Sequence, residues 1–91
     1  MTIEYHRQFK KNYARRIRPY PTLNKRTKTR VKLFISNRTN PLLKDHPLSG
    51  HMKGYRAFSI TGDVRVVYRI STDQPNTILF YDIGTHNQVY K

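Results

Sequence analysis

The stretch Val64-Arg65-Val66-Val67-Tyr68-Arg69-Ile70 decides the fold of this chain. Large apolar residues at every second position alternate with Arg65, Val67 and Arg69, and this period of two is typical of a β-strand with one face buried in the core. The residues expected on the core face are Val64, Val66, Tyr68 and Ile70. The residues expected on the opposite face are Asp63, Arg65 and Arg69.

Two further strands are predicted on either side of this one. Residues 55–60 precede it across a tight turn, and residues 77–84 follow it after a Pro-containing turn. On the preceding strand, the same alternation places Phe58 and Ile60 in the core. The residues expected to share the opposite face with the arginines are Tyr55, Ala57 and Ser59.

The first part of the chain reads as a short strand at residues 2–5 followed by two helices. Between residues 7 and 18, Phe9, Tyr13 and Ile17 recur every four positions, which places them on one side of a helix. Two prolines end this helix, and Thr22 is the expected N-cap of a second helix that runs to about residue 37.

Residues 40–54 contain two prolines and two glycines and are predicted to form a loop. The expected order is therefore β-α-α-β-β-β. This order predicts an α+β fold in which a helical hairpin packs on one face of a small antiparallel sheet. Nothing else in the chain is expected to cover the other face, so an open, arginine-bearing surface is predicted there.

The length of 91 residues predicts one domain, residues 1–91. The chain contains no Cys, so neither a disulfide nor a thiolate-metal site can support the core. No His pair has a metal-ligand spacing, and we expect no metal site. No stretch resembles a signal peptide or a membrane span, and we therefore expect a cytoplasmic protein.

Charge is the dominant feature of the composition, with a formal net of +13 at pH 7. It is uneven: residues 1–38 hold twelve Lys and Arg against one acid, whereas residues 39–91 hold six against four. Nucleic acid is the expected partner, because each neutralised phosphate releases a counterion. A merely soluble basic protein is the alternative. A membrane partner is not expected, since the basic helices lack the apolar stripe of an interfacial helix.

Two segments carry histidines that could do chemistry. His46 lies in Asp45-His46-Pro47-Leu48-Ser49-Gly50, and His86 lies in Gly84-Thr85-His86 near the end of the chain. By spacing alone, a local turn and a frayed tail explain them better than chemistry does. RNA cleavage, however, needs only a base, an acid and cations around an attacking 2′-hydroxyl, with no metal or cofactor. Histidine, arginine and tyrosine supply these groups.

The same segments carry a resemblance to a known family. The run Lys44-Asp45-His46-Pro47-Leu48-Ser49-Gly50, followed by Lys53-Gly54-Tyr55-Arg56, resembles the D-H-P-L-x-G…K-G-Y-R run of the YafQ branch of the RelE/ParE toxin superfamily. The 64–69 strand is similar to the R-x-V-Y strand of that superfamily. The ending Gly84-Thr85-His86 with Tyr90 is similar to its G-T-H…F/Y ending. The resemblance covers essentially the whole chain.

This resemblance implies the toxin of a type II toxin–antitoxin pair, an endoribonuclease that cuts mRNA in the A site of the 70S ribosome and is blocked by a cognate antitoxin. It implies His86 as general acid and Arg65 as the cation that stabilises the phosphate charge. Tyr90 would orient the mRNA, and His46 would act as base or substrate-positioning group. Asp63 matches a carboxylate at the active face.

Other basic residues are expected to contact RNA. Phosphate contacts are expected from Lys53, Arg56 and Arg69. Docking onto ribosomal RNA is expected from the helices, through Arg15, Arg16, Lys25, Arg26 and Lys28.

The chain departs from the YafQ pattern at three positions. An Asp and a His of that branch are Ala57 and Ser59 here, which leaves the identity of the general base open between His46, His51 and a reaction that relies less on a base. Asp82 stands where the branch carries a basic residue, and it could hold Arg65 or His86 or only soften the local charge.

Two other function classes fit parts of the sequence. A ParE-like inhibitor of DNA gyrase would share the fold, although it has no need of the placed His86 and His46. A non-enzymatic ribosome- or RNA-binding protein would explain the charge alone.

Overall fold

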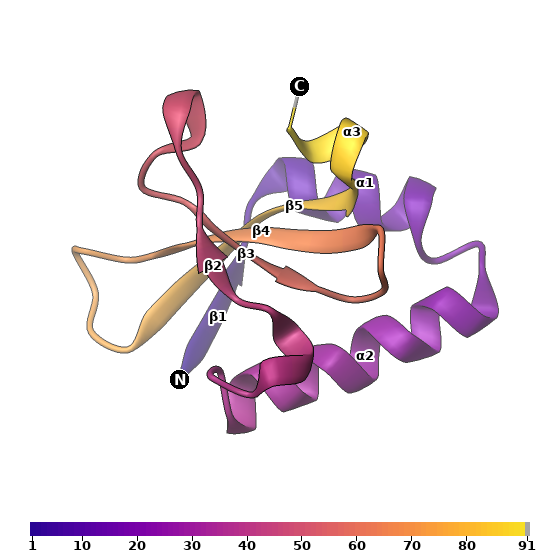
Figure 1. Cartoon of the computed structure of the whole chain (residues 1–91), viewed down its shortest axis with the longest axis horizontal. Helices are drawn as coiled ribbons and strands as arrows, with labels where there is room; N and C mark the ends of the chain where they lie inside the picture. The colour runs from indigo at the N-terminus through magenta and orange to yellow at the C-terminus, as the bar shows by residue number, and fades with distance from the viewer. Residues whose placement is uncertain (91) are drawn as a thin grey trace.

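The computed structural model describes residues 1–90 and shows one sheet of five strands with its helices arranged around it (Figure 1). The elements are, in order, β1 (Thr2–Tyr5), α1 (Arg7–Arg16), α2 (Pro21–Ser36), the 3-10 turn η1 (Pro41–Leu43), β2 (His46–Pro47), the 3-10 turn η2 (Gly50–Met52), β3 (Arg56–Ser59), β4 (Val64–Ile70), β5 (Thr77–Thr85) and α3 (His86–Val89). The α+β class is confirmed.

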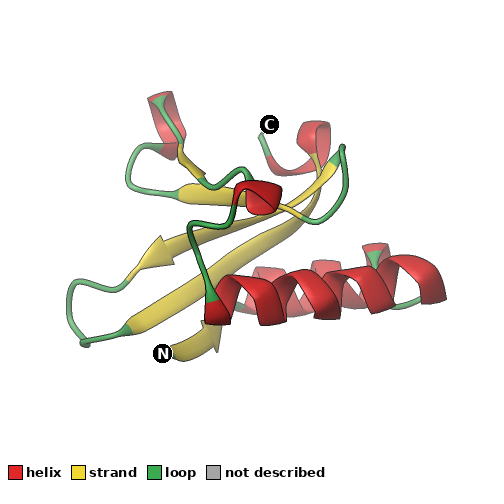
Figure 2. Cartoon of the chain, turned by 60° about the horizontal axis from the view of Figure 1, so that its bottom comes forward, coloured by secondary structure: helices red, strands yellow, loops and turns green. Residues whose placement is uncertain are grey.

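The strands lie in the order β1-β5-β4-β3-β2. The pairs β5–β4, β4–β3 and β3–β2 are antiparallel, as expected, whereas β1 runs parallel to β5 with Thr2 opposite Thr77. Four short elements were not predicted: η1, β2, η2 and α3. The two residues of β2 pair with β3 inside the segment read as loop, and α3 ends the described chain (Figure 2).

The start of α2 corrects one prediction. The helix begins at Pro21, and Thr22 lies inside it instead of capping it. Proline suits the first helical position because its fixed φ is already helical and its missing N–H needs no partner there. The start of α1 is capped by His6, whose Nδ1 accepts a hydrogen bond from the backbone N–H of Gln8 at 3.0 Å.

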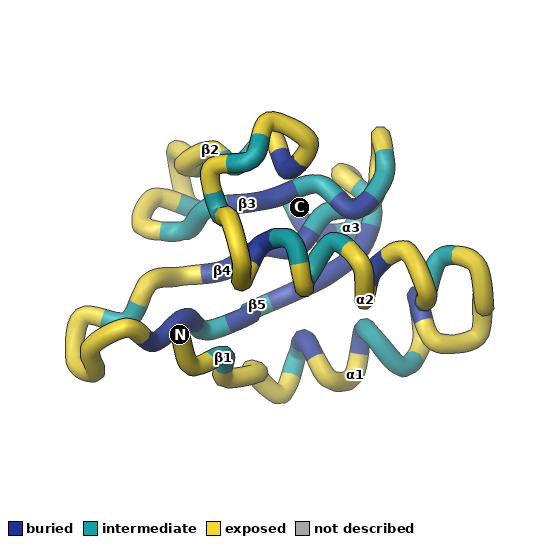
Figure 3. Tube along the Cα trace, turned by 90° about the horizontal axis from the view of Figure 1, so that it is seen from below, coloured by how far each residue is buried: buried dark blue, intermediate teal, exposed yellow. Residues whose placement is uncertain are grey.

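The core forms where the two long helices meet the sheet (Figure 3). Its centre is aromatic: the Phe34 ring of α2 stacks on Phe58 at a centroid distance of 4.4 Å and meets Tyr68 edge-on at 4.9 Å. Val66, Tyr68, Phe58 and Ile60 are buried as predicted. Ile70 is 45% exposed, against prediction, because β3 stops pairing with β4 at Tyr68 and leaves Ile70 with a strand on one side only.

A β-bulge interrupts the pairing of β5 with β4. Val67 pairs with Asp82 and Tyr68 pairs with Phe80, so Tyr81 is an extra residue in β5. Because of this extra residue, Phe80 and Ile83 both face the core although they are three positions apart. Tyr81 and Asp82 both line a cleft on the other side.

The face that carries Arg65 and Arg69, which we call the outer face, is partly covered. Ala57 and Val67 at its centre are fully buried, so the expectation of a wholly open face is wrong. On this face α3 packs against β5 and β4, and its own Val89 is buried. From spacing alone, the residues of α3 are expected to form a frayed tail instead of a helix.

Asp82 joins α1 to the edge of β5. Its buried carboxylate accepts hydrogen bonds from Asn12 Nδ2 at 2.7 Å and Gln8 Nε2 at 3.1 Å, and it lies 3.5 Å from Arg16 NH1. It also accepts the backbone N–H of Ile83 at 2.8 Å. Asp82 therefore holds α1, and the suggested roles in holding Arg65 or His86 are wrong.

Asp45 joins the loop before β2 to the core. The Tyr68 hydroxyl donates to the Asp45 carboxylate at 2.6 Å, and Arg56 Nε donates to it at 3.1 Å. Burial of the ring and the hydrogen bond to Asp45 raise the pKa of Tyr68 to about 12. The side chain of Arg56, which we expected to contact phosphate, is held within this group.

Replacing Asp82 should destabilise the protein strongly. Asp82→Ala leaves the side chains of Asn12 and Gln8 and the partly buried Arg16 without their acceptor, and we expect a loss of about 3 kcal/mol. Urea unfolding followed by circular dichroism measures it. The control is Asp73→Ala in the exposed turn before β5, which should change stability by less than about 0.5 kcal/mol. Equal midpoints for the two variants would contradict the role of Asp82.

Tyr68 should make stability depend on alkaline pH. Because its pKa is higher in the folded chain than the ordinary value of 10.0, its contribution is complete below pH 10 and is lost between pH 10 and about 12. Unfolding free energies measured across this window should fall more steeply for the wild type than for Tyr68→Phe. Parallel curves would show that Tyr68 ionises in the folded chain as it does in water.

Candidate functional site

The turn from β5 into α3 positions His86. Thr85 caps α3: its Oγ1 accepts the N–H of Gln88 at 3.4 Å, and Gln88 Oε1 accepts the N–H of Thr85 at 2.8 Å. A side chain at Gly84 would place its Cβ 2.6 Å from Gln88 Oε1 and 2.7 Å from Arg16 NH1, so the ends of both side chains would have to shift if another residue stood here. The T-x-x-Q spacing is a capping-box signal that the sequence reading missed.

Four of the five predicted catalytic residues come together beside this turn. The rings of His86 and Tyr90 meet edge-on at 4.6 Å between centroids, and Arg65 Cζ lies 5.6 Å from the centre of the Tyr90 ring. Asp63 Oδ1 accepts the backbone N–H of His86 at 3.3 Å. His86 is exposed, so its imidazole can reach a substrate. The group lies at one end of the outer face.

Arg65 is oriented by backbone. Its Nε lies 3.4 Å from the carbonyl oxygen of Asp63 and its NH2 lies 3.4 Å from that of Gly62. Within residues 1–90 it forms no ion pair with a carboxylate. Its charge is therefore available to an anionic group placed beside His86 and Tyr90.

The hydroxyl of Tyr90 is buried and has no hydrogen-bond partner in the described chain. A buried hydroxyl without a partner costs about 1–3 kcal/mol. The structure thus has a buried hydroxyl donor that no other group of the described chain uses.

His46 is not part of this cluster. It lies on β2 at the far edge of the sheet, opposite Ala57, with β3 and β4 between it and β5. Its ring is exposed, and Nδ1 lies 2.8 Å from the carbonyl oxygen of Lys44. Ser59, by contrast, pairs with Arg65 and shares its face.

The predicted RNA-contacting residues fall into two groups. Three are tied to the protein itself: Arg16 to Asp82 and the Ile83 carbonyl, Arg26 through Nε to the Ile60 carbonyl at 3.0 Å, and Arg56 to Asp45. The others are exposed and form no ion pair within residues 1–90; these are Arg15, Lys25, Lys28, Lys53 and Arg69.

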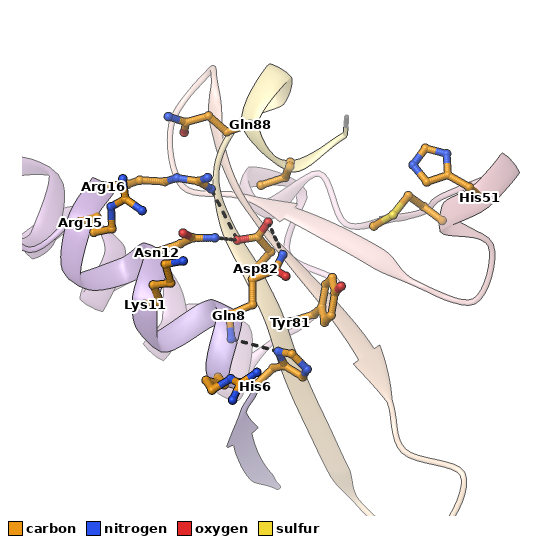
Figure 4. Close-up of a pocket in the computed structure, with 13 residues that line it drawn as sticks. His6, Gln8, Lys11, Asn12, Arg15, Arg16, His51, Tyr81, Asp82 and Gln88 are labelled. Atoms are coloured by element: carbon orange, nitrogen blue, oxygen red, sulfur yellow. Dashed lines mark hydrogen bonds and ion pairs between the residues drawn. The ribbon is translucent and has the colours of Figure 1, made fainter.

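A cleft of about 690 Å³ opens between α1, the bulge of β5, α3 and η2 (Figure 4). Its lining includes His6, Arg7, Lys11, His51, Tyr81 and Gln88. Only His51 among these six is a candidate site residue from the sequence, because no local pattern joins the others. The bulge and the docking of α1 bring them together.

Neither a metal-binding cluster nor a membrane-spanning helix is found among the described residues. Among residues 1–90 there is no group of three or more His, Cys, Asp or Glu side chains arranged to hold a metal ion. None of the described helices combines the length and apolar character needed to cross a bilayer.

Comparisons with known proteins agree on one family. A sequence model described as "Bacterial toxin of type II toxin-antitoxin system, YafQ" matches residues 1–91. The mRNA interferase toxin YafQ of Escherichia coli K12 is 35% identical over 91 residues, which is 97% of this chain and 94% of that protein. The crystal structure of a YafQ mutant from E. coli superposes with a TM-score of 0.79 at 27% identity, covering 98% of this chain and 97% of that one.

The E. coli DinJ-YafQ toxin–antitoxin complex contains a chain that superposes with a TM-score of 0.72 at 26% identity, covering 98% of this chain and 96% of that one. The superposition agrees with the α+β architecture described above. The order of the motifs around His46, Arg65 and His86 had already indicated the same family. This chain belongs to the YafQ family of bacterial toxins of type II toxin–antitoxin systems.

Proposed function

We propose that this chain is a ribosome-dependent endoribonuclease that cuts mRNA in the ribosomal A site. The observation that carries the proposal is the group formed by His86, Tyr90 and Arg65, which places an exposed imidazole, an aromatic ring and an unpaired guanidinium together. The E. coli relative is named an mRNA interferase toxin, which supports the same reaction class.

The proposed reaction uses the 2′-hydroxyl of the RNA as nucleophile. Its oxygen forms a bond to the adjacent phosphorus as the bond from phosphorus to the 5′ oxygen breaks, which leaves a 2′,3′-cyclic phosphate. His86 gives its proton to the departing 5′ oxygen. Arg65 stabilises the charge that develops on the phosphate oxygens, and Tyr90 orients the substrate through its ring and hydroxyl.

The reaction also requires an acceptor for the proton of the 2′-hydroxyl. Neither Ala57 nor Ser59 can accept it at neutral pH, and His46 lies at the other edge of the sheet. We propose that this proton leaves to solvent and that His46 contacts the substrate away from the bond being broken. Asp63 acts as a positioning residue, since it holds the start of the helix that carries His86.

Purified protein added to translating ribosomes with a defined mRNA tests this function. Primer extension should reveal new 5′ ends in register with codons, and the same mRNA without ribosomes should remain intact. Inhibition of gyrase supercoiling without cleavage would instead establish the ParE-like class. Ribosome binding with neither effect would establish a non-enzymatic binder.

The residue roles predict a graded loss of cleavage. His86→Ala should lower the rate by about 10²–10⁴-fold because the leaving oxygen loses its acid. Arg65→Ala should lower it by about 10²-fold through lost charge stabilisation. Single-turnover cleavage on ribosomes measures both, and Asn87→Ala in the same exposed helix is the matched control. A wild-type rate for His86→Ala would remove it from the mechanism.

The exposed lysines of α2 are proposed to dock onto ribosomal RNA. Lys25 and Lys28 lie on one side of the helix, whereas Arg26 is held by the Ile60 carbonyl. Reversing both charges with Lys25→Glu and Lys28→Glu should weaken ribosome binding and flatten its dependence on salt, because fewer counterions are released. Sedimentation binding at several salt concentrations measures this. Unchanged binding at every concentration would place docking elsewhere.

We also propose a cognate antitoxin whose acidic or amphipathic segment covers the cationic outer face. The existence of a DinJ-YafQ toxin–antitoxin complex in E. coli supports an antitoxin partner. Co-expression with the product of a neighbouring small reading frame should abolish cleavage, and cleavage that persists in a stable complex would place the antitoxin on another surface.

A further inference from the structure

The cleft beside α3 has an aromatic wall. The rings of His6 and Tyr81, both of which line it, lie 4.9 Å apart between centroids (Figure 4). The Tyr81 ring is followed by Tyr55 at 5.0 Å, and Arg69 Cζ lies 5.7 Å from the centre of the Tyr55 ring. Four planar groups from four segments of the chain thus form a continuous row across the outer face.

The opposite wall is cationic. Arg7, Lys11 and Arg15 of α1 all line the cleft, and their spacing of four residues places them along one side of the helix. Within residues 1–90 none of the three forms an ion pair or a side-chain hydrogen bond. The single carboxylate of the lining, Asp82, is already occupied by Asn12, Gln8 and Arg16.

The position of the cleft ties it to the proposed reaction centre. One turn of helix, α3, separates the two: His86 and Tyr90 lie beside Arg65, whereas Gln88 and Val89 line the cleft. The four residues of α3 span about 6 Å at 1.5 Å per residue. A strand of RNA with one phosphate at Arg65 can therefore reach the cleft with a neighbouring nucleotide.

We propose that this cleft is a second nucleotide-binding site for the single-stranded RNA substrate, in which a base stacks on the His6–Tyr81 ring pair and its phosphate meets Lys11, Arg7 and Arg15. The inference rests on the proposed function and names a part of the substrate path that lies outside the cleavage centre. A volume of about 690 Å³ lies within the ordinary range for small-ligand sites and accommodates one nucleotide.

RNA fits this cleft better than an acidic peptide does. Both would meet the cations of α1, but a row of aromatic rings, here tilted against one another, adds nothing to the binding of a carboxylate. Bases stack on aromatic side chains with a contribution of about 1–3 kcal/mol each, whatever their sequence. The combination of rings with unpaired cations is the arrangement found in non-specific single-strand binding sites.

A non-cleavable RNA separates binding from cleavage. The probe is a 2′-O-methyl hexanucleotide with 2-aminopurine in place of one base, scanned through the six positions. The fluorescence of 2-aminopurine falls when the base stacks on a ring. We expect one position to be quenched strongly by the wild-type protein, and anisotropy of an end-labelled copy gives the dissociation constant.

The variants remove one contact each. Tyr81→Leu removes the ring, and His6→Asn removes a ring while keeping a residue that caps α1 well. Each should abolish the quenching at that position, and Tyr81→Leu should weaken binding about tenfold. Lys11→Gln should lower the slope of log affinity against log salt by about 0.7, the loss of one phosphate contact on a single strand. The controls are Tyr20→Leu and Lys32→Gln, exposed residues outside the cleft.

Three outcomes would each decide whether the cleft binds a nucleotide. If Tyr81→Leu, His6→Asn and Lys11→Gln all bind and quench as the wild type does, the cleft is not a nucleotide site, even if ribosomal cleavage is intact. If a deca-glutamate peptide loses affinity for these variants while the RNA does not, the cleft is a peptide site instead. If His86→Ala keeps the quenching while no cleavage occurs on ribosomes even with the wild type, the proposed reaction fails and the nucleotide site stands.

Discussion

The bulge in β5 is the constraint on which the rest of the molecule depends. Tyr81 and Asp82 both stand opposite Val67, so the strand can present Phe80 and Ile83 to the same core while turning two consecutive side chains outward. The carboxylate of Asp82 then fastens α1 to the sheet edge beyond the end of β1. Without the extra residue, either Ile83 or Asp82 would face the wrong environment, and α1 would lose its buried acceptor.

The turn at the end of β5 divides the outer face into two parts. Gly84 allows Gln88 and Arg16 to approach the backbone, and the capping box of Thr85 starts α3 at His86. The helix then packs against β5 and β4, with the His86 group on one side and the cationic cleft on the other. A single helical turn therefore determines which outer-face residues can meet a substrate.

The arginines and lysines differ in whether they have a bonding partner inside the protein. Arg16, Arg26 and Arg56 are used inside the protein, where they bind a carbonyl oxygen, a carboxylate or both. Most of the cations without an ion pair within residues 1–90 lie on α1, on α2 and on the outer face, and others lie in loops. With so few acids in the chain, most arginines and lysines have no internal partner, and the self-repulsion is relieved when a polyanion binds.

The sequence by itself determined the order of the long helices and strands and most of the aromatic core, because alternation and helical spacing are local patterns that adjoining residues satisfy together. Its resemblance to a known family pointed to the residues of the His86 group. The sequence also determined the charge, which predicts a polyanionic partner. Only the tertiary structure decided the parallel pairing of β1, the bulge, the burial of Val67 and the use of Asp82 by α1. The pairing of β1 and the contacts of Asp82 join residues about seventy positions apart, and the bulge depends on how β5 pairs with β4. No local pattern exists for any of these. The cleft is of this kind: His6, Lys11, His51 and Tyr81 become neighbours only after the sheet and helices have docked.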